Sequence, residues 1–159
     1  MVIKRVEIEY EQFNSYDELQ GDDRVLVERA IEALNGSYAP YSGFKVGAAL
    51  RLADGRILHG SNQENAAYPS GLCAERTVMF YANANYPQLP VEAIAIVAFS
   101  DGELEEGVTY PCGACRQVMI EFQKRGGKDI KVILAGSKKI EIFKSVNDLL
   151  PFSFDSLDV

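Results

Sequence analysis

The chain has 159 residues, of which 47% are apolar and 25% are charged, values typical of one globular domain. The longest uncharged apolar stretch, residues 93–99, is far too short to cross a bilayer, so the composition excludes a membrane span. Sixteen basic residues against 23 acidic ones give a net charge of −7. Because a negative protein repels a phosphate backbone, we expect no nucleic-acid partner.

The N-terminal segment differs in character from the rest of the chain. Residues 1–10 alternate charged residues with valine and isoleucine, and they lack the apolar core of a secretory signal. We therefore expect a cytoplasmic protein. A polar stretch follows over residues 14–21. We interpret residues 1–21 as a peripheral N-terminal arm and residues 22–159 as a single domain.

Apolar spacing and turn residues indicate four elements in the first half of that domain. A helix is expected to begin at Asp22 or Asp23 and to end at the Asn35-Gly36 pair. Asp54-Gly55 is typical of tight hairpin turns, so strands are expected on both sides of it, over residues 46–52 and 57–61. A second helix is predicted over residues 72–83, which contain neither glycine nor proline.

The second half of the domain alternates strands and helices. Residues 91–99 are predicted to be a buried strand, and the acidic cluster at 103–106 a solvated loop. Further elements are expected as a helix over 112–124, strands over 130–135 and 140–143, and a short helix over 146–150. Five strands interleaved with helices predict an α/β fold, a three-layer α-β-α sandwich with a mixed five-stranded sheet.

Three cysteines are the residues that most clearly indicate chemistry. Cys73 lies near the start of the second predicted helix, and Cys112 and Cys115 lie at the start of the third. An odd number of cysteines argues against a disulfide framework. A helix N-terminus lowers the pKa of a thiol, and three thiolates leave a fourth zinc position open for water. We therefore expect about one zinc ion per chain.

Other interpretations of the cysteines remain open at this point. Free cysteines are often simply buried, and Cys112 with Cys115 has the spacing of a redox pair, although a redox pair does not account for Cys73. A closed structural zinc site would need a fourth protein ligand. The single histidine, His59, lies at the end of a predicted hairpin strand, where we expect a surface or edge residue.

Two residues beside Cys73 fit a zinc hydrolase. Glu75 can reach the open zinc position without coordinating, as the base of such an enzyme must. Arg76 lies three residues past Cys73 on the same helical face, where it can donate to the sulfurs and offset the net negative charge of three thiolates around Zn²⁺. A plain exposed glutamate on a helix surface is the ordinary alternative for Glu75.

Two motifs together resemble a known enzyme family. Cys73-Ala74-Glu75-Arg76, followed by Pro111-Cys112-Gly113-Ala114-Cys115-Arg116-Gln117, resembles the signature of the zinc-dependent nucleoside and nucleobase deaminases. Within that superfamily the chain is similar to the small, homotetrameric cytidine deaminases, and the similarity covers about residues 23–154. The further matching segments are residues 39–42 with Phe44, 46–48, 62–66 with 68–69, and 149–151 with Phe154.

The resemblance implies a cytidine deaminase-like fold and the hydrolytic deamination of cytidine and 2'-deoxycytidine in pyrimidine salvage. It implies that Cys73, Cys112 and Cys115 hold zinc, and that Glu75 shuttles protons while zinc-activated water attacks C4. It also implies a homotetramer with sites shared between subunits. The implied substrate contacts are Phe44 on the base, Asn62 and Glu64 on the ribose, backbone groups of Ala66 and Tyr110 at the pyrimidine edge, and Tyr68 and Phe154 across subunit boundaries.

One residue departs from the family pattern, and several alternatives remain. Tyr110 stands before Pro111, where a small serine or threonine is usual. If only its carbonyl is used, little changes, but its bulky ring leaves the shape of this loop open. A deaminase of a modified cytosine nucleoside, such as blasticidin S, would share the zinc motifs, although residues 62–66 favour an ordinary ribose. Polynucleotide deaminases usually carry histidine where this chain has Cys73. Outside the enzymes, a non-catalytic zinc-binding module is the alternative.

Overall fold

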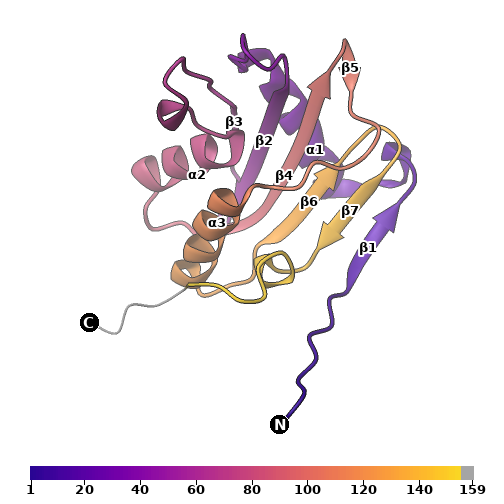
Figure 1. The fold of residues 1–159 in the computed structure, drawn as a ribbon, viewed down its shortest axis with the longest axis vertical. Coiled ribbons are helices and arrows are strands. Elements are labelled where there is room, and N and C mark those ends of the chain that lie inside the picture. Colours follow the sequence, from indigo (N-terminus) through magenta and orange to yellow (C-terminus); the bar gives the residue numbers. More distant parts are fainter. Residues whose placement is uncertain (155–159) are drawn as a thin grey trace.

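A mixed sheet of seven strands forms the middle of the molecule in the computed structural model, which describes residues 1–154 (Figure 1). The strands are β1 (Tyr10–Phe13), β2 (Lys45–Leu52), β3 (Ile57–Ser61), β4 (Val91–Ser100), β5 (Glu103–Leu104), β6 (Lys131–Ala135) and β7 (Ile140–Phe143). Their spatial order is β1-β7-β6-β4-β2-β3, with β5 paired to β4 outside this path. β4 and β6 are parallel, and the other pairs are antiparallel.

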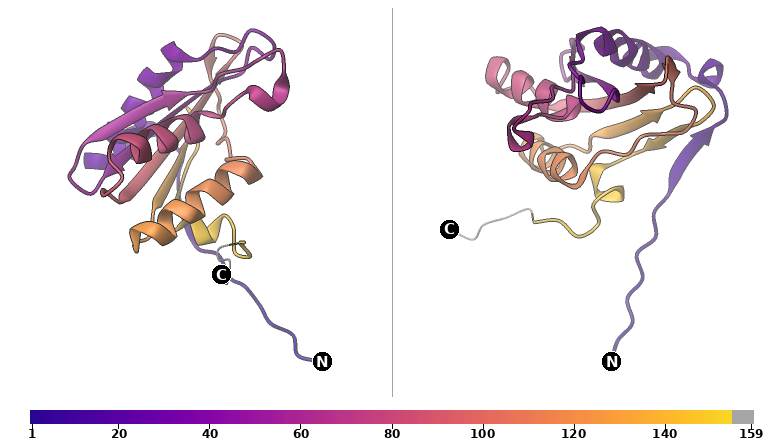
Figure 2. Two further views of the ribbon diagram at one scale, coloured as in Figure 1. Left: turned by 90° about the vertical axis from the view of Figure 1, so that its left-hand side faces the viewer. Right: turned by 45° about the horizontal axis from the view of Figure 1, so that its top comes forward.

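Helices cover both faces of the sheet. Helix α1 (Gly21–Ala33) lies on one face, and α2 (Ala74–Asn85) and α3 (Gly113–Gly126) lie on the other (Figure 2). Short 3-10 turns occupy the connections, at Tyr16–Glu18, Leu34–Gly36, Tyr68–Ser70 and Val146–Asp148. The three-layer α/β sandwich predicted from the sequence is therefore confirmed.

The apolar core has one cluster on each side of the sheet. The larger cluster packs Met79 of α2 and Met119 of α3 against strand residues such as Ile96. The smaller one packs α1 against the opposite face, where the buried strand residues are alanine, valine and isoleucine. Helix α1 approaches β2 so closely that a Cβ atom on Gly47 would lie 2.0 Å from the carbonyl oxygen of Ala30. Only glycine at position 47 allows this approach.

The prediction of a five-stranded sheet is wrong, because two further strands pair with the five expected ones. β1 lies inside the expected N-terminal arm and pairs antiparallel with β7. Without β1, the outer edge of β7 would present unpaired backbone groups. β5 lies in the acidic cluster that we expected to be a solvated loop, and it pairs with the end of β4. The side chain of Glu103 is nevertheless exposed, so the charge pattern predicted exposure and not backbone pairing.

The ends of the chain lie outside the layered core. Residues 1–9 have no regular secondary structure and lead away from β1 (Figure 1). The expected C-terminal helix over 146–150 is instead a 3-10 turn over Val146–Asp148, which begins with a capping box of Ser145 and Asp148. Residues 155–159 of the expected domain lie outside the described residues. Within residues 1–154, no helix combines the length and the apolar character that crossing a membrane requires.

Candidate metal centre and surrounding site

Helices α2 and α3 begin beside one another, and their first residues bring the three cysteines together. Cys73 is the N-cap of α2, Cys112 is the N-cap of α3, and Cys115 lies in the first turn of α3. The Sγ atom of Cys112 lies 3.9 Å from that of Cys73 and 3.4 Å from that of Cys115. All three sulfur atoms lie within 4.8 Å of one another.

This arrangement fits a zinc ion. Zn–S bonds of about 2.3 Å in a tetrahedral site place the sulfurs about 3.8 Å apart, close to the observed separations. Among residues 1–154, these cysteines are the one group of three or more histidine, cysteine or acidic side chains found close enough together to share a metal. Cys115 is buried and Cys112 is exposed, so the cluster is anchored in the core and open on one side. His59 is exposed on β3 and belongs to no such group.

The surroundings favour negative charge on the sulfurs. Hydrogen bonding with Cys115, followed by that with Arg76 and Cys112, outweighs the effect of burial and lowers the pKa of Cys73 to about 5. The Nη2 atom of Arg76 donates to Sγ of Cys73 at 3.5 Å. The contact with Cys73, together with burial, raises the pKa of Cys115. The cluster therefore carries a thiolate at neutral pH, which is the form that binds a metal.

Glu75 lies in the first turn of α2 and is 4% exposed. Burial raises the pKa of its carboxyl group, and the neighbouring negative charge of Cys73 raises it too. A carboxyl group with a raised pKa can both accept and return a proton near neutral pH. The structure thus places a buried carboxyl group in the helical turn that follows Cys73.

A polar loop lies at the entry to β2, and two of the predicted residues hold it in place. The Oδ1 atom of Asn62 accepts from the backbone N–H of Val46 at 2.9 Å, and its Nδ2 donates to the carbonyl of Phe44 at 2.9 Å. Glu64 accepts from the backbone N–H of Tyr41 at 2.8 Å and from the hydroxyl of Ser42. Hydrogen bonding to Ser42 is the main cause of the lowered pKa of Glu64. Both side chains therefore shape the loop that carries Phe44.

The remaining predicted residues are mostly exposed. Ala66 is exposed, and Tyr68, in the 3-10 turn at 68–70, is 80% exposed. Phe154 is also exposed, and its carbonyl accepts from Nε2 of Gln117 at 2.6 Å. Tyr110 exposes about half of its surface but directs its hydroxyl to Glu141 on β7, at 2.6 Å. Within one chain these four residues do not form a closed site with the cysteines.

Several residues that contact the site were not assigned a role from the sequence. Ser37 and Ser42 donate to the side chains of Asn62 and Glu64. Arg116 donates from Nε to the carbonyl of Pro111 at 2.8 Å. These three residues lie within or beside the motifs quoted above, and this proximity could have indicated from the sequence that they contact the site. Glu141 lies far from every motif in the sequence, and no such signal points to it.

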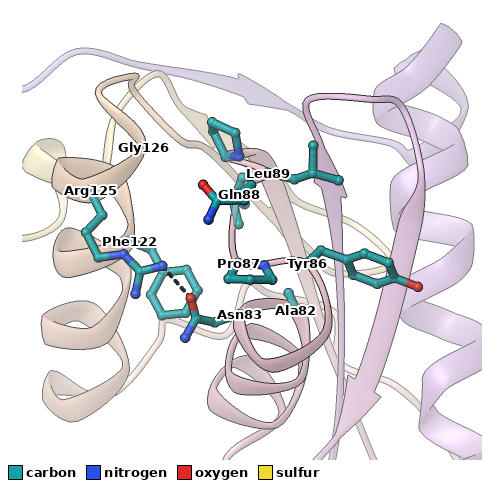
Figure 3. Close-up of a pocket in the computed structure, with 11 residues that line it drawn as sticks. Ala82, Asn83, Tyr86, Pro87, Gln88, Leu89, Phe122, Arg125 and Gly126 are labelled. Carbon is teal, nitrogen blue, oxygen red and sulfur yellow. Dashed lines mark hydrogen bonds between the residues drawn. The ribbon is translucent and has the colours of Figure 1, made fainter.

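A cavity of about 140 Å³ lies at the other end of α2 and α3 (Figure 3). It is lined by the C-terminal turns of both helices, where the guanidinium group of Arg125 donates to the side-chain oxygen of Asn83. The cysteines lie at the N-terminal ends of the same helices. This cavity is therefore separate from the metal centre.

Comparison with known proteins agrees with the fold and the cysteine cluster. The family model of the cytidine and deoxycytidylate deaminase zinc-binding region matches residues 20–127. A cytidine deaminase of Halalkalibacterium halodurans is 42% identical over 139 residues, which are 87% of this chain and 98% of that protein. One from Sporosarcina psychrophila is 39% identical over 138 residues, or 87% of this chain and 95% of that protein.

Solved structures give the same result. A crystal structure of cytidine deaminase from Burkholderia pseudomallei has a TM-score of 0.70 and 44% identity, and the match covers 82% of this chain and 97% of that one. Cytidine deaminase from Mycobacterium tuberculosis has a TM-score of 0.66 and 32% identity, covering 86% and 100% of the two chains. The fold and the three-sulfur centre define a zinc-binding α/β protein. The chain belongs to the cytidine and deoxycytidylate deaminase family.

The metal centre generates a first prediction. Purified protein should contain about one zinc ion per chain, and Cys112→Ala should lose most of it, because two remaining thiolates cannot complete the ligand set. Elemental analysis of both proteins measures this. Circular dichroism is the control that the variant is folded. Full zinc content in folded Cys112→Ala would contradict the three-cysteine site.

Proposed function

We propose that this chain is a cytoplasmic cytidine deaminase that hydrolyses cytidine and 2'-deoxycytidine to uridine and 2'-deoxyuridine with release of ammonia. It holds one zinc ion per subunit and acts as a homotetramer. The observation that carries the proposal is the buried Glu75 beside three cysteine sulfurs that lie within 4.8 Å of one another, in a chain of this family.

Proton transfer falls to Glu75. When bound, zinc supplies a Lewis acid that makes water a stronger nucleophile at neutral pH. Glu75 accepts a proton from water and delivers it to N3 of the base, while the water oxygen adds to C4. The same carboxylate then takes the second proton from the hydroxyl now on C4 and gives it to the departing amino nitrogen, so the C4–N bond breaks as the C4=O bond of uridine forms. Cytidine and water are consumed, and uridine and ammonia are formed.

Arg76 sets the electrostatics of this chemistry. Three thiolates give the metal much negative charge, which weakens its action as a Lewis acid. The guanidinium contact with Cys73 at 3.5 Å withdraws part of that charge. The N-terminal dipoles of α2 and α3 act in the same direction.

Substrate binding uses the loop that Asn62 and Glu64 organise. Phe44 is carried by this loop and offers an aromatic face to the pyrimidine. An amide and a carboxylate can together donate to and accept from the hydroxyls of a ribose. Backbone groups of Ala66 and Tyr110 serve the edge of the base.

The exposed aromatic residues support assembly into a tetramer. Tyr68 is 80% exposed and Phe154 is 67% exposed, so both aromatic side chains are free to contact another chain. We assign both to the sites of neighbouring subunits. A complete site would then need more than one chain.

The direct test is an ultraviolet assay of purified protein on cytidine, 2'-deoxycytidine, cytosine and cytidine monophosphate, with ammonia measured in parallel. We expect turnover of the two nucleosides alone. Turnover of the free base or the nucleotide with none of the nucleosides would refute the substrate assignment. If only a modified cytosine nucleoside such as blasticidin S were turned over, the alternative substrate class would be correct.

Glu75→Gln tests the proton carrier, because glutamine keeps the size of glutamate but cannot exchange a proton. Zinc should remain bound and nucleoside should still bind, since neither the cysteines nor the loop is changed. The kcat should fall by at least about 10² to 10⁴, with a much smaller effect on KM. A zinc-loaded variant with kcat within about tenfold of the parent would remove Glu75 from the mechanism.

Mixing two variants, each of which impairs one part of the site, tests whether the site is shared between subunits. Phe154→Ala should weaken nucleoside binding in the neighbouring subunit's site, whereas Glu75→Gln disables its own site. Refolding the two chains together should create some sites that have both parts intact, so activity should exceed the average of the two variants. Activity equal to that average would show that each site is built from one chain. Each variant refolded alone is the control.

A further inference from the structure

Among residues 1–154, Glu141 on β7 is the one acidic residue of a strand that is almost wholly buried. Its side chain is 1% exposed, and its strand neighbours Ile140, Ile142 and Phe143 are all buried apolar residues. Its position is flanked by Leu134 of β6 and Gln12 of β1. A carboxylate in such surroundings costs free energy unless both of its oxygens have partners. Its presence therefore calls for an explanation.

Oε2 of Glu141 has a hydrogen-bond partner, whereas Oε1 has an ion-pair partner and no hydrogen bond. The hydroxyl of Tyr110 donates to Oε2 at 2.6 Å, and Nζ of Lys139 lies 2.5 Å from Oε1. A phenol is protonated at neutral pH, so the Tyr110 hydroxyl is a donor to this carboxylate.

Tyr110 lies two residues before Cys112, so only a short segment of backbone connects this hydrogen bond to the metal centre. Pro111 between them has a fixed φ, and its carbonyl accepts from Nε of Arg116 at 2.8 Å. The carbonyl of Cys112 accepts from the backbone N–H of Arg116 at 3.0 Å, the first bond of α3. Residues 110–112 are thus held from the β7 side by Glu141 and from the α3 side by Arg116.

We propose that Glu141 is a positioning residue. Its hydrogen bond with the Tyr110 hydroxyl fixes residues 110–112 and thereby determines the position of the Cys112 sulfur. Cys112 needs such support because it is the exposed member of the three cysteines. The proposal rests on the proposed function only in requiring that the cysteines bind zinc.

The test measures zinc affinity with zinc alone, by competition with a chromogenic chelator, on the parent and four variants. Tyr110→Phe removes only the donating hydroxyl and should raise the zinc dissociation constant about tenfold, the lower end of the effect of groups that support metal ligands. Tyr16→Phe is the matched control, because its hydroxyl donates to Glu28 at 2.8 Å in the same type of pair outside this segment. The control should leave zinc affinity unchanged.

The double variant Tyr110→Phe with Glu141→Leu separates positioning from stability. Replacing both partners by apolar groups leaves no buried charge without a donor, so its thermal stability should return to that of the parent or exceed it. Its zinc dissociation constant should nevertheless stay raised, because the segment has lost its anchor. Glu141→Gln keeps an accepting oxygen and should retain most of the affinity.

Two results would overturn the positioning role. One is a zinc dissociation constant in Tyr110→Phe no higher than in Tyr16→Phe. The other is a double variant that regains zinc affinity together with stability, which would make the pair a structural one. Deaminase activity of the parent is measured separately. A parent that binds zinc but releases no ammonia would refute the proposed function and leave this comparison valid.

Discussion

The direction of two strands determines where the metal centre lies. β4 and β6 are the parallel pair of the sheet, and each follows a helix on the same face, α2 before β4 and α3 before β6. Helices that lead back into parallel strands run in the same direction, so both begin at the same edge of the sheet. Cys73 and Cys112 are the N-caps of these helices, and they meet because the helix starts meet. The polarity of the helices then adds positive potential where the thiolates gather.

The rest of the site depends on side chains that hold loops to this framework. Asn62 and Glu64 fix the loop that carries Phe44 through backbone hydrogen bonds at 2.8–2.9 Å. Arg116 fixes the carbonyl of Pro111, the residue directly after Tyr110, whose hydroxyl is bonded to Glu141. Because these loops are ordered on folding, less conformational entropy remains to be lost when a ligand binds.

Much of the fold could be predicted from local pattern, and the limits have physical reasons. Strand 57–61 and strand 140–143 have the predicted bounds because turn residues delimit them. β1 was missed because the alternation of Val6, Ile8 and Tyr10 suggests a strand that begins four residues too early, and pairing with β7 selects Tyr10–Phe13 instead. Local sequence reports which residues can be extended, whereas the partner strand decides which of them are.

Prediction of the site shows the same division. The proximity of three cysteines follows from their places at two helix starts, which the sequence shows directly. The burial of Glu141 does not, since a charged residue between two isoleucines is typical of a strand with one exposed face. Its partner Tyr110 lies 31 residues away in the chain. Only the completed sheet brings the two together.

The low pKa of Cys73 has a consequence for the redox chemistry of the protein. A thiolate is the form of cysteine that oxidants attack, and with a pKa of about 5 this side chain is largely ionised at neutral pH. The exposed thiol of Cys112 lies 3.9 Å away, near enough to trap an oxidised sulfur as a disulfide. Coordination to a metal occupies both sulfurs and blocks this route. Loss of the metal would therefore open the two helix starts to oxidative crosslinking, and a reducing environment would keep the chain ready to take the metal up again.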